Sequence, residues 1–446
     1  MSEDQEKKDL SRRTFIGGAA VAGVALAACA APQKEETLSL GPKMTLGPEL
    51  APEGEPIRAG VIGCGGRGTG AAGNFLTAGP GLEVVALADT FDDRLQNCRN
   101  RLKEQHGAEI ANENCFVGLE AYKQLLEADI NYVIIATPPY FRPEQFAAAV
   151  DARKNIFMEK PACVDPVGAR SIMESAEKAT ALNLKVATGT QRRHQKNYIE
   201  TYNQIMDGAI GQITSARAYW NQSQLWFKEK QSGWSDMEWM IRDWVNWCWL
   251  SGDHIVEQHV HNVDVINWFT HSHPVNAVGM GGRARRVTGD QYDFFAVDYE
   301  MESGIHMLSM CRQVDGCENN VSEYIVGTKG SSNCADTIYD LDGNVVWQYE
   351  PAKDEAGNVT DTSPYVQEHI DLVTCIREDK PINEANNTAV STLTAVMGRT
   401  SAYTGNLVTW DEMMSSMETE GPEELTMGSY PDIVGDPAPP VPGTAE

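Results

Sequence analysis

The chain has 446 residues, of which 42% are hydrophobic and 22% are charged. This length exceeds that of one ordinary domain and predicts two globular domains, each able to bury a core. The formal net charge of -27 repels nucleic-acid phosphates and anionic lipid headgroups, so we expect neither nucleic-acid binding nor charge-driven membrane binding. A small neutral or cationic ligand is compatible with this charge.

Residues 1–29 have the pattern of a targeting segment. Arg12 and Arg13, in "SRRTFIGG", precede an apolar run of about fourteen residues, which is shorter than the ~20 residues of a membrane-spanning helix. The pattern resembles a twin-arginine export signal, which predicts the twin-arginine machinery as a partner and a location in the bacterial cell envelope or periplasm. The following "LAAC" resembles a lipoprotein box with Cys29 as the lipidated residue; the alternative is a cleavage region with an incidental cysteine.

Two segments are predicted to lie outside the domains. Residues 30–54 are rich in Pro, Gly and Glu and predict a linker, and residues 421–446 predict a disordered or loosely packed tail. The cysteines beyond Cys29 show neither a C-x-x-C pair nor zinc-finger spacing, so we expect no metal site from them. We expect them to be buried and unpaired, with a disulfide between Cys311 and Cys317 as the alternative.

Residues 55–190 alternate short apolar runs with amphipathic segments. The apolar runs predict strands at 57–63, 82–89, 131–138, 155–161 and 185–190. The segments between them predict helices at 68–78, 121–128, 143–153 and 167–182. Strands and helices that alternate at this spacing imply an α/β domain with a parallel sheet covered on both faces.

Residues 191–420 have a different rhythm, with longer β-rich runs. These runs predict strands at 213–220, 277–287, 294–301, 304–314 and 322–328. The pattern is that of a second, α+β domain with a mostly antiparallel sheet.

The turn "VIGCGGRG" places Gly63-x-Gly65-x-x-Gly68 directly after the first predicted strand and at the start of a helix. These glycines permit a tight turn and close approach to a pyrophosphate, whose charge the helix N-terminus stabilises. Asp89 ends the second strand and would accept hydrogen bonds from ribose hydroxyls, which favours NAD, whereas Arg67 and Arg94 would attract the 2′-phosphate of NADP. The alternative is a glycine turn that binds no dinucleotide.

Two further motifs, "ATPP" at 136–139 and "MEKP" at 158–161, follow the next two strands. With the glycine turn, "SGDHIVEQHVHNVD" and the late "EHIDLVTCIREDKPINEANNTAVSTLTAVMGR", they make residues 57–412 resemble the Gfo/Idh/MocA oxidoreductases, the glucose-fructose oxidoreductase and inositol dehydrogenase family. The resemblance implies an N-terminal Rossmann domain, an open-faced sheet in the second domain, and NAD or NADP as cofactor. It also implies a homo-oligomer, a dimer or tetramer, because that sheet commonly packs against another subunit.

The resemblance also implies roles for individual residues. The lysine of E-K-P would place Lys160 near the nicotinamide and the sugar hydroxyl. The family's usual Asp-x-x-x-His is here Glu257-x-x-x-His261, so the carboxylate reaches one methylene further. Many members have a histidine where this chain has Arg142, so that histidine's cofactor contact does not transfer. The predicted cofactor-binding residues are Gly63, Gly65, Arg67, Gly68, Asp89, Thr137, Pro138, Glu159 and Lys160.

Sugar oxidation requires a base that takes the hydroxyl proton as hydride leaves. His261 suits this role, because histidine is the side chain that titrates near neutrality. A lysine whose pKa is lowered by burial or by the cofactor's positive ring can polarise the oxygen and share the proton, which fits Lys160. We therefore predict Lys160, His261 and Glu257 as catalytic; the alternative for Lys160 is a surface lysine after a strand.

The stretch "SGDHIVEQHVHNVDVINWF" at 251–269 is rich in histidine and acid. On one continuous helix, His254, Glu257, His261 and Asp264 would lie within about 80° of arc, with His259 nearly opposite. We expect Glu257 and Asp264 to orient His261 or the sugar. A zinc site is a second hypothesis, although neither H-E-x-x-H nor H-x-x-E-H occurs, and a polar helix seam is a third.

Eight of the ten tryptophans lie within residues 220–268. Aromatic faces stack on the C–H faces of sugars, so the cluster predicts a carbohydrate-lined cleft, with core packing as the alternative. The predicted substrate-binding residues are Arg193, His194, Arg242, Trp244 and Asp264.

These features together predict an NAD(P)-dependent oxidoreductase that acts on a sugar, glycoside or polyol hydroxyl. Because the cell envelope offers no free nicotinamide pool, we expect a tightly bound, internally recycled cofactor. Two other classes remain open. One is an NAD-dependent glycosidase that acts by transient oxidation, and the other is a non-catalytic sugar-binding protein on the same fold.

Overall fold

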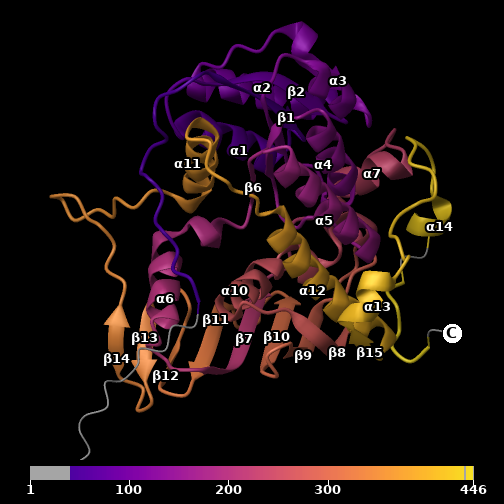
Figure 1. Cartoon of the computed structure of the whole chain (residues 1–446). Helices are drawn as coiled ribbons and strands as arrows, with labels where there is room; N and C mark the ends of the chain where they lie inside the picture. The colour runs from indigo at the N-terminus through magenta and orange to yellow at the C-terminus, as the bar shows by residue number, and fades with distance from the viewer. Residues whose placement is uncertain (1–40, 436–437, 445–446) are drawn as a thin grey trace, which may run out of the picture. The chain divides into compact units, whose positions relative to one another are not determined.

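A six-stranded parallel sheet forms the first half of the protein in the computed structural model, which describes residues 41–435 and 438–444 (Figure 1). Its strands follow the order β3-β2-β1-β4-β5-β6. The order reverses between β1 and β4, and in such sheets ligands bind in the crevice at that reversal. The bounds are β1 (Ile57–Ile62), β2 (Leu82–Asp89), β3 (Cys115–Val117), β4 (Tyr132–Ile135), β5 (Asn155–Met158) and β6 (Val186–Thr188).

Five helices and two short turns connect these strands. They are α1 (Gly66–Thr77), α2 (Asp92–His106), η1 (Asn112–Asn114), α3 (Ala121–Glu127), η2 (Pro139–Phe141), α4 (Arg142–Asp151) and α5 (Pro166–Ala181). The predicted α/β class is confirmed, but α2 and β3 were absent from the prediction. Helix α2 is strongly polar and buries only Leu95, Cys98 and Leu102, which leaves a narrow apolar stripe.

A nine-stranded sheet forms the second half, in the order β14-β13-β12-β11-β7-β10-β9-β8-β15. All its neighbouring pairs are antiparallel except β10 with β7, so the predicted mostly antiparallel sheet is confirmed. The bounds are β7 (Ile213–Gln222), β8 (Pro274–Gly282), β9 (Phe294–Met301), β10 (His306–Gln313), β11 (Asn320–Gly327), β12 (Gly330–Ser332), β13 (Thr337–Asp340), β14 (Val345–Gln348) and β15 (Leu407–Thr409).

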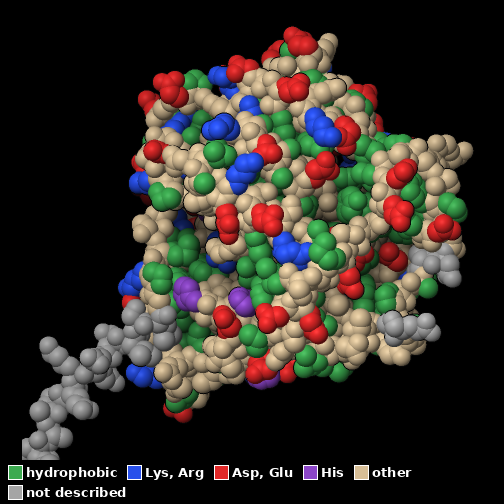
Figure 2. Space-filling view, turned by 45° about the vertical axis from the view of Figure 1, so that its right-hand side comes forward, with side chains coloured by type: hydrophobic (Ala, Val, Ile, Leu, Met, Phe, Trp, Pro, Cys, Tyr) green, Lys and Arg blue, Asp and Glu red, His purple; other side chains and the backbone are tan. Residues whose placement is uncertain are grey.

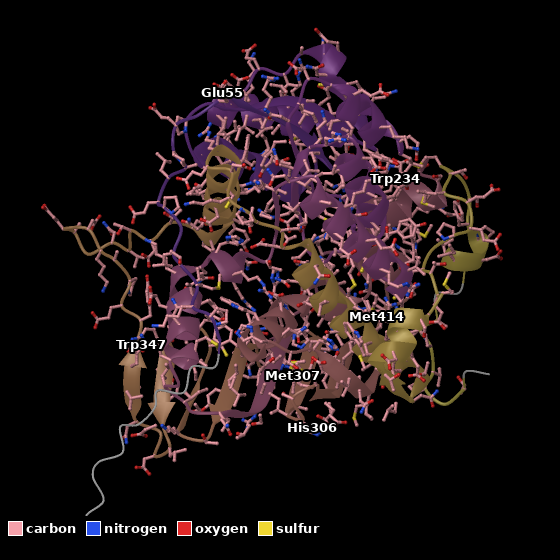
Figure 3. All side chains as sticks on the ribbon, in the orientation of Figure 1. Glu55, Trp234, His306, Met307, Trp347 and Met414 are labelled. Carbon is pink, nitrogen blue, oxygen red and sulfur yellow. The ribbon has the colours of Figure 1, made fainter. Side chains whose placement is uncertain are left out.

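The two faces of this sheet differ. On β10, Met307 is fully buried toward the helices, whereas the neighbouring His306 lies on the opposite, exposed face (Figure 3). Leu308 and Met310 share that exposed face. The open face therefore matches the one that the family resemblance implies, while the oligomeric state stays a prediction.

Helices of the second half cover the other face and the junction with the first sheet. They are η3 (Gln191–His194), α6 (Lys196–Met206), α7 (Asp236–Arg242), η4 (Trp244–Asn246), α8 (Cys248–Ser251), α9 (His254–Glu257), α10 (Val260–Thr270), α11 (Pro364–Arg377), α12 (Ala385–Thr404), α13 (Trp410–Ser415) and α14 (Pro431–Val434). Helix α11 returns to the first half and packs against α1, where Ile370, Leu372 and Val373 join its core (Figure 1). Residues 55–190 therefore do not close a core alone, because part of their cover comes from residues 364–377.

The described part of the predicted linker, residues 41–54, is fastened to the protein. The Met44 amide donates to Asn203 Oδ1 (2.8 Å), and Gln367 Nε2 donates to the Pro48 carbonyl (2.9 Å). Ala51 is buried. Residues 41–54 therefore pack on the protein and do not lie outside its domains as predicted, because hydrogen bonds and the buried Ala51 hold them in place.

The described part of the predicted tail is also packed. Asp236 accepts hydrogen bonds from the Ser429 hydroxyl and the Tyr430 amide, both at 2.7 Å. Ile433 and Val434 pack against a buried cluster that contains Trp247. Residues 421–435 therefore contact the second half of the protein through partly buried side chains, and none of them is fully buried.

Several other predictions concern the termini, metals and cysteines. The export signal at 1–29, Cys29 and the start of the linker lie outside the described residues. Across residues 41–435 and 438–444, no helix is long and apolar enough to cross a membrane, and no group of three potential metal ligands occurs. All nine described cysteines are free, so the alternative Cys311–Cys317 disulfide is not formed.

Candidate active site

The glycine turn after β1 begins the site. Gly63 has φ +91°, and a Cβ there would lie 2.7 Å from the Thr137 amide nitrogen. A Cβ on Gly68 would lie 1.8 Å from the Gly63 carbonyl oxygen, so glycine is required where α1 approaches the turn. No side chain caps the N-terminus of α1, which leaves its first amides available to an anionic group.

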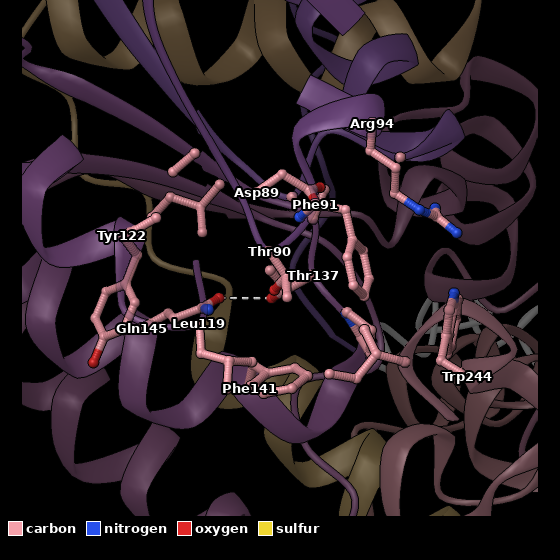
Figure 4. A pocket seen from close by; sticks show the side chains of 18 of the residues that line it. Asp89, Thr90, Phe91, Arg94, Leu119, Tyr122, Thr137, Phe141, Gln145 and Trp244 are labelled. Atoms are coloured by element: carbon pink, nitrogen blue, oxygen red, sulfur yellow. Dashed lines mark hydrogen bonds between the residues drawn. The ribbon is translucent and has the colours of Figure 1, made fainter. Parts of the chain in front are cut away.

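A cavity lies against this turn, and Asp89 is in its wall (Figure 4). The Cys64 amide donates to Asp89 Oδ2 (2.7 Å) and the Phe91 amide donates to Oδ1 (2.8 Å), so the carboxylate is fixed at the end of β2. Burial raises the pKa of Asp89, and these two amides lower it. Thr137 lies across the cavity and donates to Gln145 Oε1 (2.6 Å).

Arg67 lines the nucleotide cavity and pairs with two acids. It pairs with Glu159 through Nε and with Glu368 Oε1 through an Nη at 2.9 Å. Burial lowers the pKa of Arg67. The negative charges of Glu159 and Glu368 together raise it by more, so the net shift of this pKa is upward. Both predicted NADP-favouring arginines, Arg67 and Arg94, line the cavity, and the charge of Arg94 lies near Asp89.

Arg142 joins the two motif loops, "ATPP" and "MEKP". Its guanidinium donates to the carbonyls of Thr137 (2.9 Å), Glu159 (2.9 Å) and Pro161 (2.5 Å), and the side chain is almost fully buried. Burial lowers the pKa of Arg142 to about 10. Where the family often has a histidine, this chain therefore has a cation that positions the loop carrying Lys160.

Lys160 and Glu257 meet across the junction of the two halves. The Lys160 ammonium donates to the Glu257 backbone carbonyl (2.5 Å) and to Glu257 Oε1 (3.1 Å). The two side chains are only 12% and 14% exposed. The longer glutamate thus reaches Lys160, and it positions the ammonium rather than the histidine ring.

His261 lies beside this pair, at the start of α10. Its ring stacks on Trp220 with a centroid distance of 5.6 Å and an interplanar angle of 21°. Burial lowers the pKa of His261 well below its usual value, and the positive charges of Lys160, Arg192 and Arg67 lower it further. His261 is therefore a neutral imidazole at neutral pH and is able to accept a proton.

This low pKa sets an expected pH profile. Because His261 is already deprotonated at neutral pH, kcat/KM should not decline on acidification until the pH falls below ~6.5, the ordinary histidine value. The measurement is the rate of nicotinamide reduction by a reactive sugar as a function of pH. An acidic limb centred at ~6.5 or higher, and absent from a His261→Ala variant, would contradict a buried, cation-flanked imidazole.

The histidine-rich stretch is not one helix. Helix α9 ends at Glu257 and α10 begins at Val260, so the predicted common face of His254, Glu257, His261 and Asp264 does not exist. The break is held by Gln258, whose Oε1 accepts bonds from Gln222 Nε2 (2.6 Å) and Gln313 Nε2 (3.1 Å) of the sheet.

The other members of that stretch are buried in the fold. His254 is 2% exposed and pairs with its neighbour Asp253 (2.9 Å), so it does not stand at the mouth of a site. His259 is fully buried and bonds to the Ser309 hydroxyl (2.7 Å), as a packing role requires.

Three predicted sugar ligands lie away from Lys160. Arg193 forms a bidentate ion pair with Asp264 (2.8 and 2.9 Å), and Ser391 Oγ also donates to Asp264 (2.8 Å). His194 is clamped between Asp371 (2.6 Å) and Glu384 (3.1 Å). Ion pairs within the protein balance the charges of these residues, so the structure does not place them as ligands of a sugar at Lys160.

The tryptophans are dispersed instead of lining one sugar cleft. Trp226 and Trp244 line the nucleotide cavity with Ile241, and Trp247 and Trp249 are buried in the core. Arg242 also belongs to this end, where it forms a bidentate pair with Asp93 of α2 (2.8 and 3.0 Å). Trp244 therefore lines the nucleotide cavity (Figure 4). Arg242 lies over the ring of Phe91, which also lines that cavity, so neither residue is at the sugar as predicted.

Sequence reasoning missed two residues around His261 and Arg67. Arg192 pairs with Glu323 and lies 5.8 Å from the centroid of the Trp220 ring. Tyr365 stacks under the Arg67 guanidinium at 4.9 Å. The motif "QRRH" contained Arg192, but the pattern gave no reason to prefer it over Arg193.

The observed residues fit a bound dinucleotide. The glycine turn and the uncapped α1 helix suit its pyrophosphate, and Asp89 stands where the ribose hydroxyls would lie. A Cβ on Gly66 would meet nothing within 4 Å, so the turn has open space in front of it. The phenyl ring of Phe91 and the indole of Trp244 suit an adenine ring at the far end.

Comparisons with known proteins agree with this arrangement. A model of the Gfo/Idh/MocA oxidoreductase family, described as an NAD-binding Rossmann fold, matches residues 57–187. The Gfo/Idh/MocA C-terminal domain model matches residues 198–333. The two models together match more than half of the chain.

Individual relatives share low identity with this chain over part of its length. Inositol 2-dehydrogenase of Salmonella typhimurium is 27% identical over 156 residues, 35% of this chain and 43% of that protein. A glycosyl hydrolase family 109 protein of Solibacter usitatus is 27% identical over 249 residues, 52% of this chain and 51% of that protein. This chain thus spans about half or less of the curated relatives that it matches.

Solved structures share the fold. Scyllo-inositol dehydrogenase of Lactobacillus casei with bound NAD(H) and scyllo-inositol superposes with a TM-score of 0.59 at 21% identity. The match covers 79% of this chain and 99% of that one. With both halves matched by models of one family, the chain belongs to the Gfo/Idh/MocA oxidoreductase family and has its NAD-binding Rossmann domain.

Proposed function

We propose that this protein oxidises a hydroxyl group of a sugar, glycoside or polyol by hydride transfer, with an NAD that stays bound and is recycled within the enzyme. The observation that carries the proposal is the Lys160–Glu257 pair beside a neutral, buried His261. A proton donor and a proton acceptor thus meet at the carboxyl edge of the parallel sheet, next to the glycine turn.

These contacts suggest a role for each residue in the proposed reaction. NAD, when bound, supplies the hydride acceptor at C4 of its nicotinamide ring. His261 accepts the hydroxyl proton, because its imidazole is neutral. Lys160 donates a hydrogen bond to the substrate oxygen and stabilises the charge that develops there, and Glu257 holds the ammonium in place. The substrate loses one hydride and one proton and becomes a carbonyl.

Retention of the cofactor is supported by a clasp from the second half of the chain, residues 226–244. Trp226 and Trp244 line the nucleotide cavity, and Arg242 connects this segment to α2 through Asp93. Arg242 also lies 3.9 Å from the centroid of the Phe91 ring. A nucleotide under this clasp would leave only after these contacts open. This suits the exported location that residues 1–29 predict, where NAD is not replenished.

The proposal is tested by purifying the protein and identifying any released ligand by mass spectrometry. We expect NAD or NADH, and we expect its reduced-nicotinamide absorbance to change when a reactive sugar, glycoside or polyol is added. A protein that contains no nucleotide and gains none on incubation with NAD would contradict the proposal.

Arg242→Ala should loosen the clasp. We expect bound NAD to dissociate several-fold to ~10-fold faster, because an ion pair and a cation–π contact are lost. Exchange of bound NAD for labelled NAD measures the rate. Arg217→Ala is the matched control, because Arg217 stacks on Tyr324 in the distant sheet. An equal exchange rate in the two variants would show that the clasp does not retain the nucleotide.

A second candidate function is an NAD-dependent glycosidase that acts by transient oxidation. It is favoured by the similarity to the Solibacter usitatus protein, which covers 52% of this chain, against 35% for the inositol dehydrogenase. The bound cofactor would then be reduced and reoxidised in one turnover. Release of the aglycone from aryl glycosides without net NADH would favour this function over net oxidation.

A further inference from the structure

A second cavity of about 390 Å³ opens beside η3, apart from the catalytic residues. Its lining includes Arg193, Tyr202, Asn267, Trp268, His271 and Ser391, and none of Lys160, Glu257 or His261. Figure 2 shows a hollow with histidine side chains along one side, in keeping with the histidines of this lining. Its volume lies within the ~300–1,000 Å³ of small-molecule sites.

The short helix η3 separates this second cavity from the catalytic residues. Arg192 lies over Trp220, which stacks on His261, whereas the next residue, Arg193, lies over Trp268 in the second cavity. The two arginines therefore serve opposite sides of η3.

One wall of the cavity is rigid. Trp268 stacks on Tyr202 with centroids 5.0 Å apart at 23°, and the Arg193 guanidinium covers the Trp268 ring at 5.4 Å. Asp264 holds Arg193 by two hydrogen bonds. A wall that is already ordered loses little conformational entropy when a ligand binds.

The cavity carries no uncompensated charge. The Arg193 charge is balanced by Asp264. Burial and the charge of Arg193 lower the pKa of His271, so this imidazole is neutral at neutral pH. His273 has Glu302 as its nearest acid, at 3.8 Å. The lining therefore favours a neutral ligand over an ionised one.

The lining does offer hydrogen-bond acceptors. The Tyr202 hydroxyl donates its single proton to the Pro42 carbonyl (2.8 Å), so its second bond, to His271 Nε2 (2.9 Å), must be donated by the imidazole. In neutral His271 this leaves Nδ1 as an acceptor. Asn267 Nδ2 donates to Thr394 Oγ1 (3.2 Å), and Asn267 Oδ1 is buried without a partner among the described residues.

We propose that this cavity binds a neutral sugar or polyol at a site separate from the catalytic one. Sugar hydroxyls donate protons to acceptors such as His271 Nδ1 and Asn267, and they accept from the Arg193 guanidinium. A bound hydroxyl would supply the proton donor that the buried Asn267 carbonyl oxygen lacks. The site would anchor a saccharide beside the enzyme's substrate, and it does not depend on the proposed catalysis.

Equilibrium dialysis of the NAD-loaded protein against labelled D-glucose, D-galactose, N-acetyl-D-glucosamine and myo-inositol tests this. His271→Gly removes the rim acceptor, and glycine tolerates the φ of +49° at this position. We expect at least one probe to bind the Lys160→Met protein, whose catalytic residue is removed, and His271→Gly in that background to weaken binding by ~10-fold. His306→Ala, at an exposed histidine on β10, should change nothing.

Asn267→Leu gives a second, internal test, with a melting curve to confirm folding. If it folds, it should also weaken binding, and His271→Gly decides alone if it does not. Three outcomes would overturn the proposal. The first is that no probe binds, and the second is that the Lys160→Met protein binds the probe equally well with and without His271→Gly. The third is stronger binding of D-glucuronate than of D-glucose, which would show a site for an anion.

Discussion

His261→Ala should slow reduction of the bound nicotinamide by ~10²-fold or more, because the variant lacks the base that takes the hydroxyl proton. The measurement is single-turnover absorbance after mixing with the most reactive sugar. NAD content should not change, because His261 is absent from the lining of the nucleotide cavity. The loss should appear in kcat more than in KM, since proton removal belongs to the transition state.

Two comparisons make this test specific. His306→Ala removes an exposed histidine that pairs with Asp298 on β9, and should retain full activity. Added imidazole should restore part of the rate in His261→Ala, because the space beside Trp220 is left open. A His261→Ala protein with the wild-type rate would show that His261 is not the base that takes the hydroxyl proton.

Lys160→Met should also lower the rate by ~10²-fold or more, through loss of the hydrogen bond to the substrate oxygen. Methionine keeps most of the length and of the apolar stem of lysine, so the loop that Arg142 holds should stay in place. Imidazole should not restore this variant, because the proton acceptor is still present. The same single-turnover measurement applies.

Glu257→Gln separates positioning from charge. The glutamine can still accept a hydrogen bond from the Lys160 ammonium, and the Glu257 backbone carbonyl bond is retained. We therefore expect a smaller loss of rate in Glu257→Gln than in Lys160→Met.

The control for Lys160→Met is Lys103→Met, since Lys103 pairs with Glu109 on the surface. Equal rates in Lys103→Met and Lys160→Met would exclude a catalytic role for Lys160.

The nucleotide half was largely predictable because its signals are local. Strands covered on both faces appear as continuous apolar runs, such as "VVALA" in β2, and the glycine turn has its own steric signature. Helix α2 was missed because most of its residues are charged or polar. Its Leu95, Cys98 and Leu102 do recur at helical spacing, so a weak signal was present.

The catalytic and substrate assignments were less predictable because they depend on distant partners. The helix-face argument for residues 254–264 assumed one uninterrupted helix. Gln258 interrupts it, since strands β7 and β10 hold its side chain. The pattern of residues within 251–269 cannot reveal these two contacts, because their partners lie 36 and 55 positions away from Gln258 in the sequence.

The amino-acid sequence by itself determined the order of strands and helices, the glycine turn, and the position of Lys160 directly after a parallel strand. Only the tertiary structure decided which charged side chains serve the site. Adjacent Arg192 and Arg193 pair with Glu323 and Asp264 on different elements, and Arg242 pairs with Asp93, 149 residues away. A buried charge goes where its counter-charge lies, because an unpaired buried ion is too costly, and that location is a property of the fold.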